Sequence, residues 1–424
     1  MKPRAFLIRS WVPASSLSRD AEDLGLYAAA SARSWSRSPQ LVRLDGLTSA
    51  QLRAARDKAR LLDIQVADAM PYRHQEDWSE GLLLLADTAS LDTLARNLTL
   101  AQPSVGEALS AMLGAISQRK RRLRLKSGEL ALGGEAGAIL MGILNVTPDS
   151  FSDGGRFSDP DAGVAHALAM AAAGARVIDV GGESSRPGSR PVEAAEEMRR
   201  TLPVIERLRA VLPPGVHVSI DTMKAEVARR AVEAGAEIIN DVSGLSADPQ
   251  MRAAAALLGV PVVINHMKGT PGTMQQAPSY RHVIPEIVAD LYALVDAALQ
   301  AGVAGDKIII DPGIGFGKRG SHNLAILRHI PAFVSLGRPV MVGLSRKSFL
   351  ADLAPAPEAS SSRDHGGDAR ADATLASETV ALMSGAHILR THDVQRAARA
   401  LKLAEAVSMQ AASSESPALP AAPD

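Results

Sequence analysis

The sequence has 424 residues, of which 46% are hydrophobic and 22% are charged, the balance of an ordinary globular protein with a large core. Lys and Arg total 46, as do Asp and Glu, so the net charge of zero argues against a protein that coats nucleic acid or lies on a membrane surface. The absence of cysteine excludes disulfides, thiolate metal sites and cysteine nucleophiles, and an aromatic content of 3% disfavours a protein that stacks on single-stranded bases.

Residues 1–118 predict a small α+β accessory domain. Helical periodicity covers residues 49–67 and 90–116, with an interruption of the second helix at Pro103. A short apolar run at residues 82–86 is typical of a strand. No motif in this region suggests chemistry.

A basic stretch follows, with six Lys or Arg among the eight residues 119–126. A nucleic-acid or localisation patch is one interpretation. The alternation of Leu123 and Leu125 with charged residues, followed by Ser127 and Gly128, favours a half-exposed hairpin strand instead. We therefore expect a basic hairpin and linker over residues 119–137, and no nucleic-acid partner.

Between residues 138 and 406, eight short β-type runs alternate with Ala-rich helical stretches. Such alternation predicts parallel strands with helices outside them. Eight repeats in about 270 residues match a (β/α)8 TIM barrel, with a doubly wound open sheet as the alternative. The runs are 139–144, 177–180, 216–220, 237–240, 262–265, 308–311, 340–344 and 386–389, and the helices include 162–173, 194–211, 224–234 and 284–301.

Two segments at the end of the chain are poor in core-forming residues. Residues 355–368 are rich in Pro, Ala, Ser and Gly, and they predict a mobile surface loop inserted before the last helical run. Residues 407–424 predict a disordered tail because they contain few residues that a core could bury.

Each predicted strand ends in a polar or charged cluster. In barrels these ends converge on the face that carries the active site. A cap or a turn is the more common role of any single such residue, but eight in register are hard to explain as caps. The connections over residues 145–155 and 181–188 combine Gly, Pro, Ser and Asp, as active-site lids do, although they could be ordinary loops. The strand-end residues are Asn145, Glu183–Arg186, Asp221, Asn240–Asp241, Asn265–His266, Asp311, Ser345–Lys347, Arg390 and His392.

Eight ordered segments of this region resemble the dihydropteroate synthases, pterin-binding enzymes of the folate pathway. Corrinoid-dependent methyltransferases that bind methyltetrahydrofolate share the barrel, but they lack the long first lid, the SRPG loop and the SRKS segment. A binding protein that has lost turnover is a third hypothesis, which the intact lids disfavour. The segments are MGILNVTPDSFSDGG (141–155), DVGGESSRPG (179–188), SIDTMK (219–224), INDVSG (239–244), NHMKG (265–269), DPGIGFGK (311–318), GLSRKSFL (343–350) and RTHDV (390–394).

The resemblance implies a condensation of 6-hydroxymethyl-7,8-dihydropterin diphosphate with 4-aminobenzoate that releases diphosphate. Such a reaction needs a slot for a flat heterocycle, in which charge-assisted hydrogen bonds contribute about 1.5–3 kcal/mol each. For an isolated Met or Phe, core packing would be the ordinary interpretation. The residues implied for the pterin slot are Asp221, Asn240, Asp311 and Lys347 at the ring edge, with Met267, Phe316 and Arg390 on its faces.

The resemblance also implies an anion site with Mg2+, the hard cation usual for phosphate groups. Asn145 would bind the metal, and Ser185, Arg390 and His392 would hold the diphosphate, although His392 alone could be structural. Ser185 stands where many family members have threonine, and it keeps the hydroxyl. Catalysis would rest on positioning and electrostatic stabilisation. The residues implied to be catalytic are Lys347, Asp221, Arg390 and His392.

The aminobenzoate is expected beside the seventh strand. Ser348, at the start of the following helix, would receive its carboxylate, with a plain helix cap as the alternative. Phe151, Arg186 and Pro187 on the two lids would close over its ring.

The expected partners are the two small-molecule substrates and a second copy of the chain, because the family is typically dimeric. No segment reaches the roughly 20 apolar residues of a membrane-spanning helix. The N-terminus also lacks an export signal, so a cytoplasmic protein without a membrane partner is expected.

Overall fold

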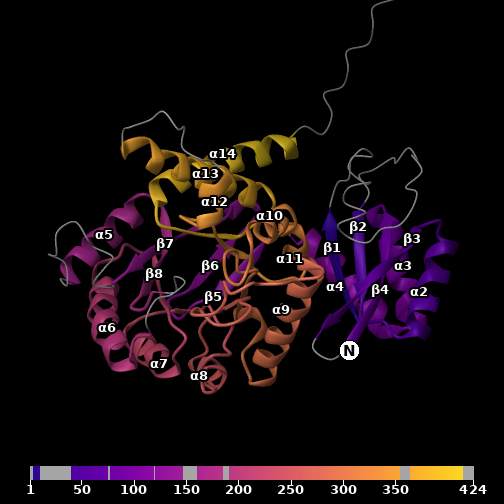
Figure 1. The fold of residues 1–424 in the computed structure, drawn as a ribbon, viewed down its shortest axis with the longest axis horizontal. Coiled ribbons are helices and arrows are strands. Elements are labelled where there is room, and N and C mark those ends of the chain that lie inside the picture. Colours follow the sequence, from indigo (N-terminus) through magenta and orange to yellow (C-terminus); the bar gives the residue numbers. More distant parts are fainter. Residues whose placement is uncertain are drawn as a thin grey trace, which may run out of the picture.

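The computed structural model describes residues 3–9, 40–74, 77–118, 120–146, 160–184, 191–353 and 363–413. Figure 1 shows a barrel surrounded by helices, with a smaller sheet-and-helix domain on one flank.

Eight parallel strands form the barrel, in the order β12-β11-β10-β9-β8-β7-β14-β13. A parallel bridge between Ile310 and Val340 joins the two ends of this order. The predicted TIM barrel is therefore confirmed, and the open doubly wound sheet is excluded. The strands are β7 (Ile139–Asn145), β8 (Ala175–Gly181), β9 (His217–Asp221), β10 (Ile238–Asp241), β11 (Val262–Asn265), β12 (Ile308–Asp311), β13 (Met341–Gly343) and β14 (Ile388–Thr391).

The helices cover the outside of the barrel because each buries an apolar stripe against strands that are themselves buried on both faces. In β12, for example, all four residues are buried. The helices are α5 (Pro160–Ala172), α6 (Ala194–Val211), α7 (Ala225–Ala234), α8 (Met251–Leu258), α9 (Val283–Gln300), α10 (Gly320–Arg328), α11 (Ile330–Val334), α12 (Ser348–Leu353), α13 (Arg363–Met383) and α14 (Val394–Ser413).

Two predicted boundaries near the C-terminus are wrong. Helix α13 begins at Arg363, inside the segment 355–368 that the sequence predicts as a loop, and residues 354–362 lie outside the described part. Helix α14 continues to Ser413, past the predicted start of a disordered tail at residue 407. Ala397, Ala400 and Ala404 bury one stripe of α14 against the barrel. The sequence from residue 405 to 413 contains neither Pro nor Gly, so nothing in it stops the helix.

A hairpin closes the amino end of the barrel. Its strands are β5 (Arg121–Arg124) and β6 (Glu129–Leu132), and their leucines belong to one buried cluster with the inward side chains of the barrel strands. Arg122 and Arg124 alternate with these leucines and are exposed. Arg121 is buried, and its guanidinium donates to the carbonyl of Ala115 at 2.8 Å. The leucines in the cluster are Leu123, Leu125, Leu130 and Leu132.

The N-terminal domain is an antiparallel sheet of order β1-β2-β4-β3, with three helices packed on one face. The opposite face presents Phe6, Leu41 and Leu85 to the core of the barrel. The Leu7 amide also donates to Ser335 Oγ at 2.9 Å, which ties β1 to the barrel. The elements are β1 (Arg4–Arg9), β2 (Gln40–Asp45), β3 (Gln65–His74), β4 (Asp77–Ala86), α2 (Ser49–Leu61), α3 (Thr88–Ala101) and α4 (Pro103–Ser117).

The helix predicted over residues 49–67 ends earlier, at Leu61. Asp63 has a φ of 56°, a left-handed turn that stops the helix. The apolar residues that follow belong to β3, so residues 65–67 follow a strand period rather than a helical one.

Among the described residues, no helix combines the length and the hydropathy that crossing a bilayer requires.

Candidate active site

A cavity of about 700 Å³ opens at the carboxyl ends of the barrel strands. Most of the residues that the sequence predicts as a site line this cavity together. Ser185, Phe151, Arg186 and Pro187 lie outside the described residues. The predicted residues that line it are Asn145, Asp221, Asn240, Asp311, Phe316, Lys347, Ser348, Arg390 and His392.

Arg390, in β14, ties the floor of the cavity together. Its Nε donates to Asp179 Oδ2 at 2.7 Å, and its Nη2 donates to Asp221 Oδ2 at 2.6 Å. Asn240 Nδ2 also donates to Asp179 Oδ2, at 2.9 Å. Asp179 is not among the predicted site residues, because it lies inside β8 rather than at its end. The signal for it is a charged residue within an apolar run.

Several acceptor atoms on this floor have no hydrogen-bond partner within the described structure. They include Asp179 Oδ1 and Asn240 Oδ1, both buried. Buried polar atoms in native proteins are nearly always paired, so acceptors left open around a cavity indicate a ligand that brings N–H groups.

Burial also makes the floor carboxyls harder to ionise. It raises the pKa of Asp221 to about 7, against the opposing charge of Arg390 and with help from the nearby carboxylate of Asp179. Burial raises the pKa of Asp311 to about 6, although Asp311 accepts a hydrogen bond from the Gly313 amide at 2.7 Å. A ligand that donates to these carboxylates would relieve this cost.

Lys347 and Phe316 form one wall. The Lys347 ammonium lies 4.0 Å from the centroid of the Phe316 ring, and burial lowers the pKa of Lys347 to about 8. Gly315 lets the two meet, because its φ is 84° and a Cβ there would lie 2.8 Å from Lys347 Cδ. The wall therefore offers an apolar face beside a cationic donor.

Lys318, which is not among the predicted site residues, holds two loops of the site. Its ammonium is buried, and it donates to His266 Nδ1 at 2.9 Å and to the carbonyl of Phe316 at 2.9 Å. His266 Nε2 lies 2.9 Å from Asp290 Oδ2, so an imidazole that accepts at Nδ1 donates from Nε2. Burial, together with the charge of Lys318, lowers the pKa of His266 to about 4, so the ring is neutral.

His392 and Asn145 lie at another part of the cavity wall. The Ser345 hydroxyl accepts from the His392 amide at 3.2 Å and lies 3.0 Å from His392 Nδ1, so it fixes the ring. Asn145 ends β7 next to Gly181, where a Cβ would lie 3.5 Å from the Asn145 amide oxygen. Among the described residues, no group of three or more His, Asp or Glu side chains is arranged to bind a metal ion.

Met267 does not lie where it was expected, and Glu183 has a structural partner. Met267 is half-buried and does not line the cavity, whereas the buried Met274 does; no pattern in the sequence distinguished the two. Glu183 lines the cavity but is bound by Lys224, whose ammonium also donates to Glu197 at 2.6 Å. Glu183 therefore has the structural role that a strand-end residue often has.

Comparison with known proteins places these residues in a family. A family model described as pterin binding enzyme matches residues 141–392. The chain is 45% identical to the dihydropteroate synthase of Mycobacterium leprae over 265 residues, which are 62% of this chain and 91% of that protein. It is 43% identical to the dihydropteroate synthase of Escherichia coli K12 over 267 residues, or 63% of this chain and 90% of that protein.

Solved structures similar to this chain include members of the same family. Xanthomonas albilineans dihydropteroate synthase with 4-aminobenzoic acid has a TM-score of 0.61 at 42% identity, covering 68% of this chain and 98% of that chain. The same enzyme in complex with 7,8-dihydropteroate has a TM-score of 0.58 at 40% identity, with the same coverage. Because the match spans the barrel and its strand-end motifs, the chain belongs to the dihydropteroate synthase family of pterin-binding enzymes.

Proposed function

We infer that the chain condenses 6-hydroxymethyl-7,8-dihydropterin diphosphate with 4-aminobenzoate, giving 7,8-dihydropteroate and diphosphate in folate biosynthesis. The observation that carries this inference is the floor of the cavity, where buried carboxyl and amide oxygens have no hydrogen-bond partner in the described structure. The barrel around them belongs to a family of pterin-binding enzymes. Relatives with 4-aminobenzoic acid and with 7,8-dihydropteroate support both the acceptor and the product.

The pterin is held at its edge and on its face. Asp311, Asp221 and Asn240 accept hydrogen bonds from its amino and ring N–H groups, and the open Oδ1 of Asn240 supports this for the amide. Lys347 donates to the ring oxygen and nitrogen. Its lowered pKa reflects the cost of burying the ammonium, which hydrogen bonds to the ring would offset. Phe316 packs on the ring. We assign the other apolar contact to Met274 rather than Met267, since Met274 lines the cavity.

The leaving diphosphate is assigned to Arg390 and His392, and Ser185, which lies outside the described residues, is proposed as a third contact. The carbon–oxygen bond breaks with its electron pair on the diphosphate, and the cation that remains is delocalised over the pterin. Arg390 and His392 stabilise the charge that develops on the leaving oxygens, which is electrostatic catalysis. The aromatic amine then attacks the methylene carbon and loses its proton.

We propose that Mg2+ assists the departure of diphosphate. Asn145 supplies one hard amide oxygen at the cavity wall, and substrate phosphates and water would complete the shell of such an ion. Gly181 leaves room beside the Asn145 oxygen. When bound, the ion neutralises phosphate charge.

The aminobenzoate is assigned to the side of the cavity at α12. Ser348 is exposed at the cavity wall, where its hydroxyl can bind the carboxylate. Phe151, Arg186 and Pro187 are proposed to cover the ring.

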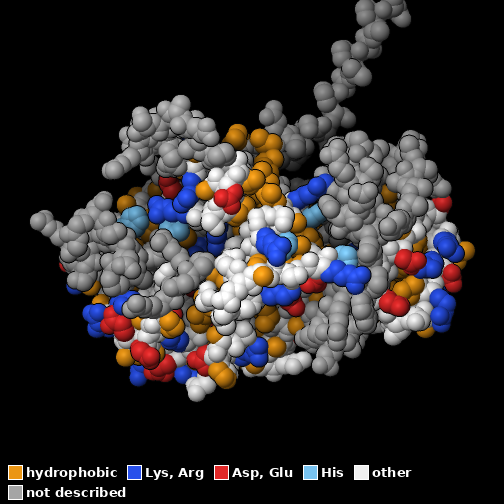
Figure 2. Space-filling view, in the orientation of Figure 1, with side chains coloured by type: hydrophobic (Ala, Val, Ile, Leu, Met, Phe, Trp, Pro, Cys, Tyr) orange, Lys and Arg blue, Asp and Glu red, His pale blue; other side chains and the backbone are white. Residues whose placement is uncertain are grey.

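We propose that two copies of the chain pair through α13 and α14. Large apolar side chains are exposed on these helices, and Figure 2 shows hydrophobic side chains gathered over α14. Light scattering on the wild type should give a dimer mass, and Leu403→Glu should give a monomer. A monomeric wild type would overturn the pairing. The exposed residues are Val380, Met383, Leu403 and Val407.

A cytoplasmic location rests on the sequence alone.

The decisive experiment is an assay of labelled aminobenzoate incorporation into pteroate by the full-length protein with Mg2+. We expect one diphosphate released per pteroate formed, and loss of both when a chelator removes the metal. Pteroate formation without any diphosphate, or no incorporation at all, would contradict the proposal and favour the methyl-transfer or binding-protein alternatives.

A further inference from the structure

Two loops of the active site pack on each other where they leave neighbouring strands of the barrel. Strands β11 and β12 pair in parallel, and just past β11 the His266 amide donates to the Asp311 carbonyl at 2.9 Å. Gly313 allows the close approach of the loops, because its φ is 70° and a Cβ there would lie 1.8 Å from the His266 carbonyl oxygen. The loop that carries Phe316 therefore lies directly against the loop that carries His266.

A buried lysine joins these loops through three hydrogen bonds. Lys318 is 2% exposed, and its Nζ donates to His266 Nδ1 at 2.9 Å, to the His266 carbonyl at 3.2 Å and to the Phe316 carbonyl at 2.9 Å. Three acceptors around one nitrogen require an ammonium, and they use all of its N–H groups. Lys318 therefore lines the cavity with no N–H group left to donate to a substrate.

An imidazole connects this ammonium to a carboxylate on the outer side of the barrel. His266 Nε2 lies 2.9 Å from Asp290 Oδ2 in α9. The His266 side chain is 2% exposed, whereas the Asp290 side chain is 40% exposed. Because Nδ1 accepts from Lys318, Nε2 carries the ring proton and donates to Asp290. A neutral ring therefore links a buried cation to an anion at the surface.

The charge of Asp290 helps to keep Lys318 protonated. Burial lowers the pKa of Lys318 well below its usual value, and the charges of Lys347 and Lys268 lower it further. The carboxylates of Asp311 and Asp290 oppose this fall. Without Asp290, Lys318 loses its proton more readily, and a neutral amine has only two N–H groups for three acceptors.

We propose that Asp290, His266 and Lys318 form a relay that positions the pterin site from the outer side of the barrel. Asp290 fixes the ring of His266, and Lys318 then fixes the loop whose Phe316 packs on the pterin. The three act as positioning residues, since their effect on the ligand passes through Phe316. The proposal rests on the proposed function for the identity of the ring that binds there.

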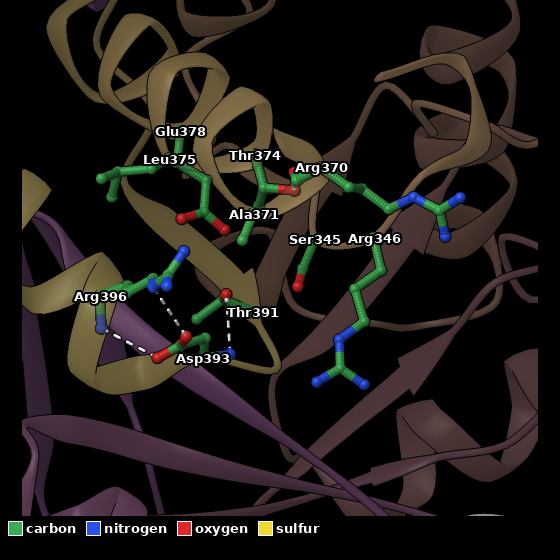
Figure 3. A pocket seen from close by; sticks show the side chains of 10 residues that line it. All are labelled: Ser345, Arg346, Arg370, Ala371, Thr374, Leu375, Glu378, Thr391, Asp393 and Arg396. Atoms are coloured by element: carbon green, nitrogen blue, oxygen red, sulfur yellow. Dashed lines mark hydrogen bonds and ion pairs between the residues drawn. The ribbon is translucent and has the colours of Figure 1, made fainter. Parts of the chain in front are cut away.

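Other charged side chains beside the active site do not converge in this way. A second cavity, of about 510 Å³, lies between α13, the segment after β13 and the start of α14 (Figure 3). Figure 3 shows Arg346 and Arg370 directed away from the Glu378 carboxyl, so these groups do not meet at one point. The relay, in contrast, ends on the carbonyl of Phe316, a residue of the active-site wall.

Two further hydrogen bonds hold the same loop at its more exposed side. Gln275 Nε2 donates to the Gly315 carbonyl at 2.8 Å, and the Tyr280 hydroxyl donates to the Gly317 carbonyl at 3.1 Å. Because these bonds remain when the relay is broken, the loop should loosen rather than unfold. Loss of one charge-assisted hydrogen bond corresponds to a change in affinity of about tenfold.

Calorimetric titration of the full-length protein with 6-hydroxymethylpterin tests the relay. Asp290→Asn keeps the size of the side chain and an acceptor for His266, but it removes the charge. We expect it to bind the pterin about tenfold more weakly than the wild type at pH 8. The deficit should shrink at pH 6, where Lys318 regains its proton. The matched control is Asp296→Asn, more than one turn further along α9, which should bind like the wild type.

Steady-state kinetics separate positioning from general damage to the fold. In Asp290→Asn, the KM for the pterin diphosphate should rise about tenfold, while the KM for aminobenzoate stays within about twofold of the wild type. Equal increases in both KM values, or equal weakening of pterin binding by Asp290→Asn and Asp296→Asn, would overturn the relay. Unchanged pterin binding by Asp290→Asn would overturn it as well.

A double-mutant cycle tests whether Asp290 acts through Lys318. Lys318→Met removes the ammonium from the buried site, so Asp290→Asn should weaken pterin binding no further in that background. Additive effects of the two substitutions would contradict the relay, and if Lys318→Met does not fold, the titrations of Asp290→Asn still decide. Pteroate synthesis by the wild type does not depend on this outcome, and the pterin titration does not depend on turnover, so the two proposals fail separately.

Discussion

The two ends of the barrel differ in how their buried polar groups are paired by hydrogen bonds. At the amino end, the Ser127 amide and hydroxyl donate to the two carboxyl oxygens of Glu237 at 2.7 and 2.9 Å, and His217 Nδ1 lies 2.7 Å from the same carboxyl. At the carboxyl end, Asp179 and Asn240 each keep a buried oxygen without a partner in the described structure. The same eight strands carry both ends.

The difference in hydrogen bonding suggests that the amino end serves the stability of the fold and the carboxyl end serves ligand binding. Leaving a buried acceptor unpaired costs about 1–3 kcal/mol, so the carboxyl end weakens the folded state until a ligand supplies donors. The amino end, filled by hairpin leucines and by the hydrogen-bonded group of Ser127, His217 and Glu237, offsets that cost, although Arg121 Nε there is also without a partner in the described structure. Substitutions at the carboxyl end should therefore change mainly kcat and ligand binding, and substitutions at the amino end mainly the free energy of unfolding.

Lys347→Ala should have the largest effect. Removing the Lys347 ammonium, which lies beside the Phe316 ring, is expected to lower kcat about 10²- to 10³-fold, because an electrostatic contact to the reacting ring is lost. Lys307 is the matched control, since its ammonium binds the Arg124 carbonyl at the amino end. Pteroate synthesis by Lys347→Ala, Lys307→Ala and the wild type, with circular dichroism to verify folding, checks this. A near-normal kcat in Lys347→Ala would refute its role.

Leu130→Ala should act at the amino end of the barrel, and it should lower the stability of the fold rather than kcat. Leu130 is 1% exposed in the cluster that closes the barrel, so its truncation leaves a cavity and should destabilise the fold by about 3 kcal/mol. Below the unfolding transition, kcat should stay within about twofold of the wild type. Urea unfolding and turnover on the same preparations measure both. A large loss of kcat in a fully folded Leu130→Ala would show that the ends are not separable.

Asn145→Ala should reduce the metal dependence at the carboxyl end. Loss of the amide oxygen is expected to weaken Mg2+-dependent binding of the pterin diphosphate about tenfold. Calorimetry with and without Mg2+ measures the change, and Asn97→Ala, on α3 of the N-terminal domain, is a control remote from the cavity. An unchanged metal dependence would remove Asn145 from the metal site.

The carboxyl end was also the more predictable end from sequence. Asn145, Asp221, Asp311 and Arg390 each lie at or next to the end of a predicted strand, and barrel geometry alone brings such positions together. The strand count followed from the alternation of short apolar runs with helical ones. The fold class was therefore accessible from local pattern.

What the sequence did not reveal depends on contacts between distant segments. Asp179 and Lys318 act through partners on other strands and loops, at residues 390 and 266, which no local pattern indicates. Met274 replaces Met267 in the cavity because of a loop path that periodicity does not describe. The early end of the helix predicted over residues 49–67 follows from one left-handed residue, Asp63.

The dependence of stability on pH should have opposite signs at the two ends, and this is the smallest effect. The pKa of Asp221 is raised to about 7, so the folded ligand-free protein binds more protons than the unfolded chain between about pH 4 and pH 7. Its contribution to stability is therefore present at low pH and lost as pH rises through about 7. Burial would raise the pKa of Glu237 too, but hydrogen bonds from His217 and Ser127 outweigh it and lower that pKa. Its contribution is present above the usual glutamate pKa and lost as pH falls.

Thermal unfolding of the ligand-free protein between pH 4 and pH 8 tests the two signs. Asp221→Asn should raise the melting temperature at pH 8 relative to the wild type, by a few degrees for each kcal/mol, and have little effect at pH 4. Glu237→Gln should lower the melting temperature at pH 8 and have less effect at pH 4. If both variants shifted the melting temperature in the same direction at pH 8, the contrast between an end built for ligand and an end built for stability would be wrong, because removing a charge that burial destabilises and removing one that hydrogen bonds stabilise should have opposite effects.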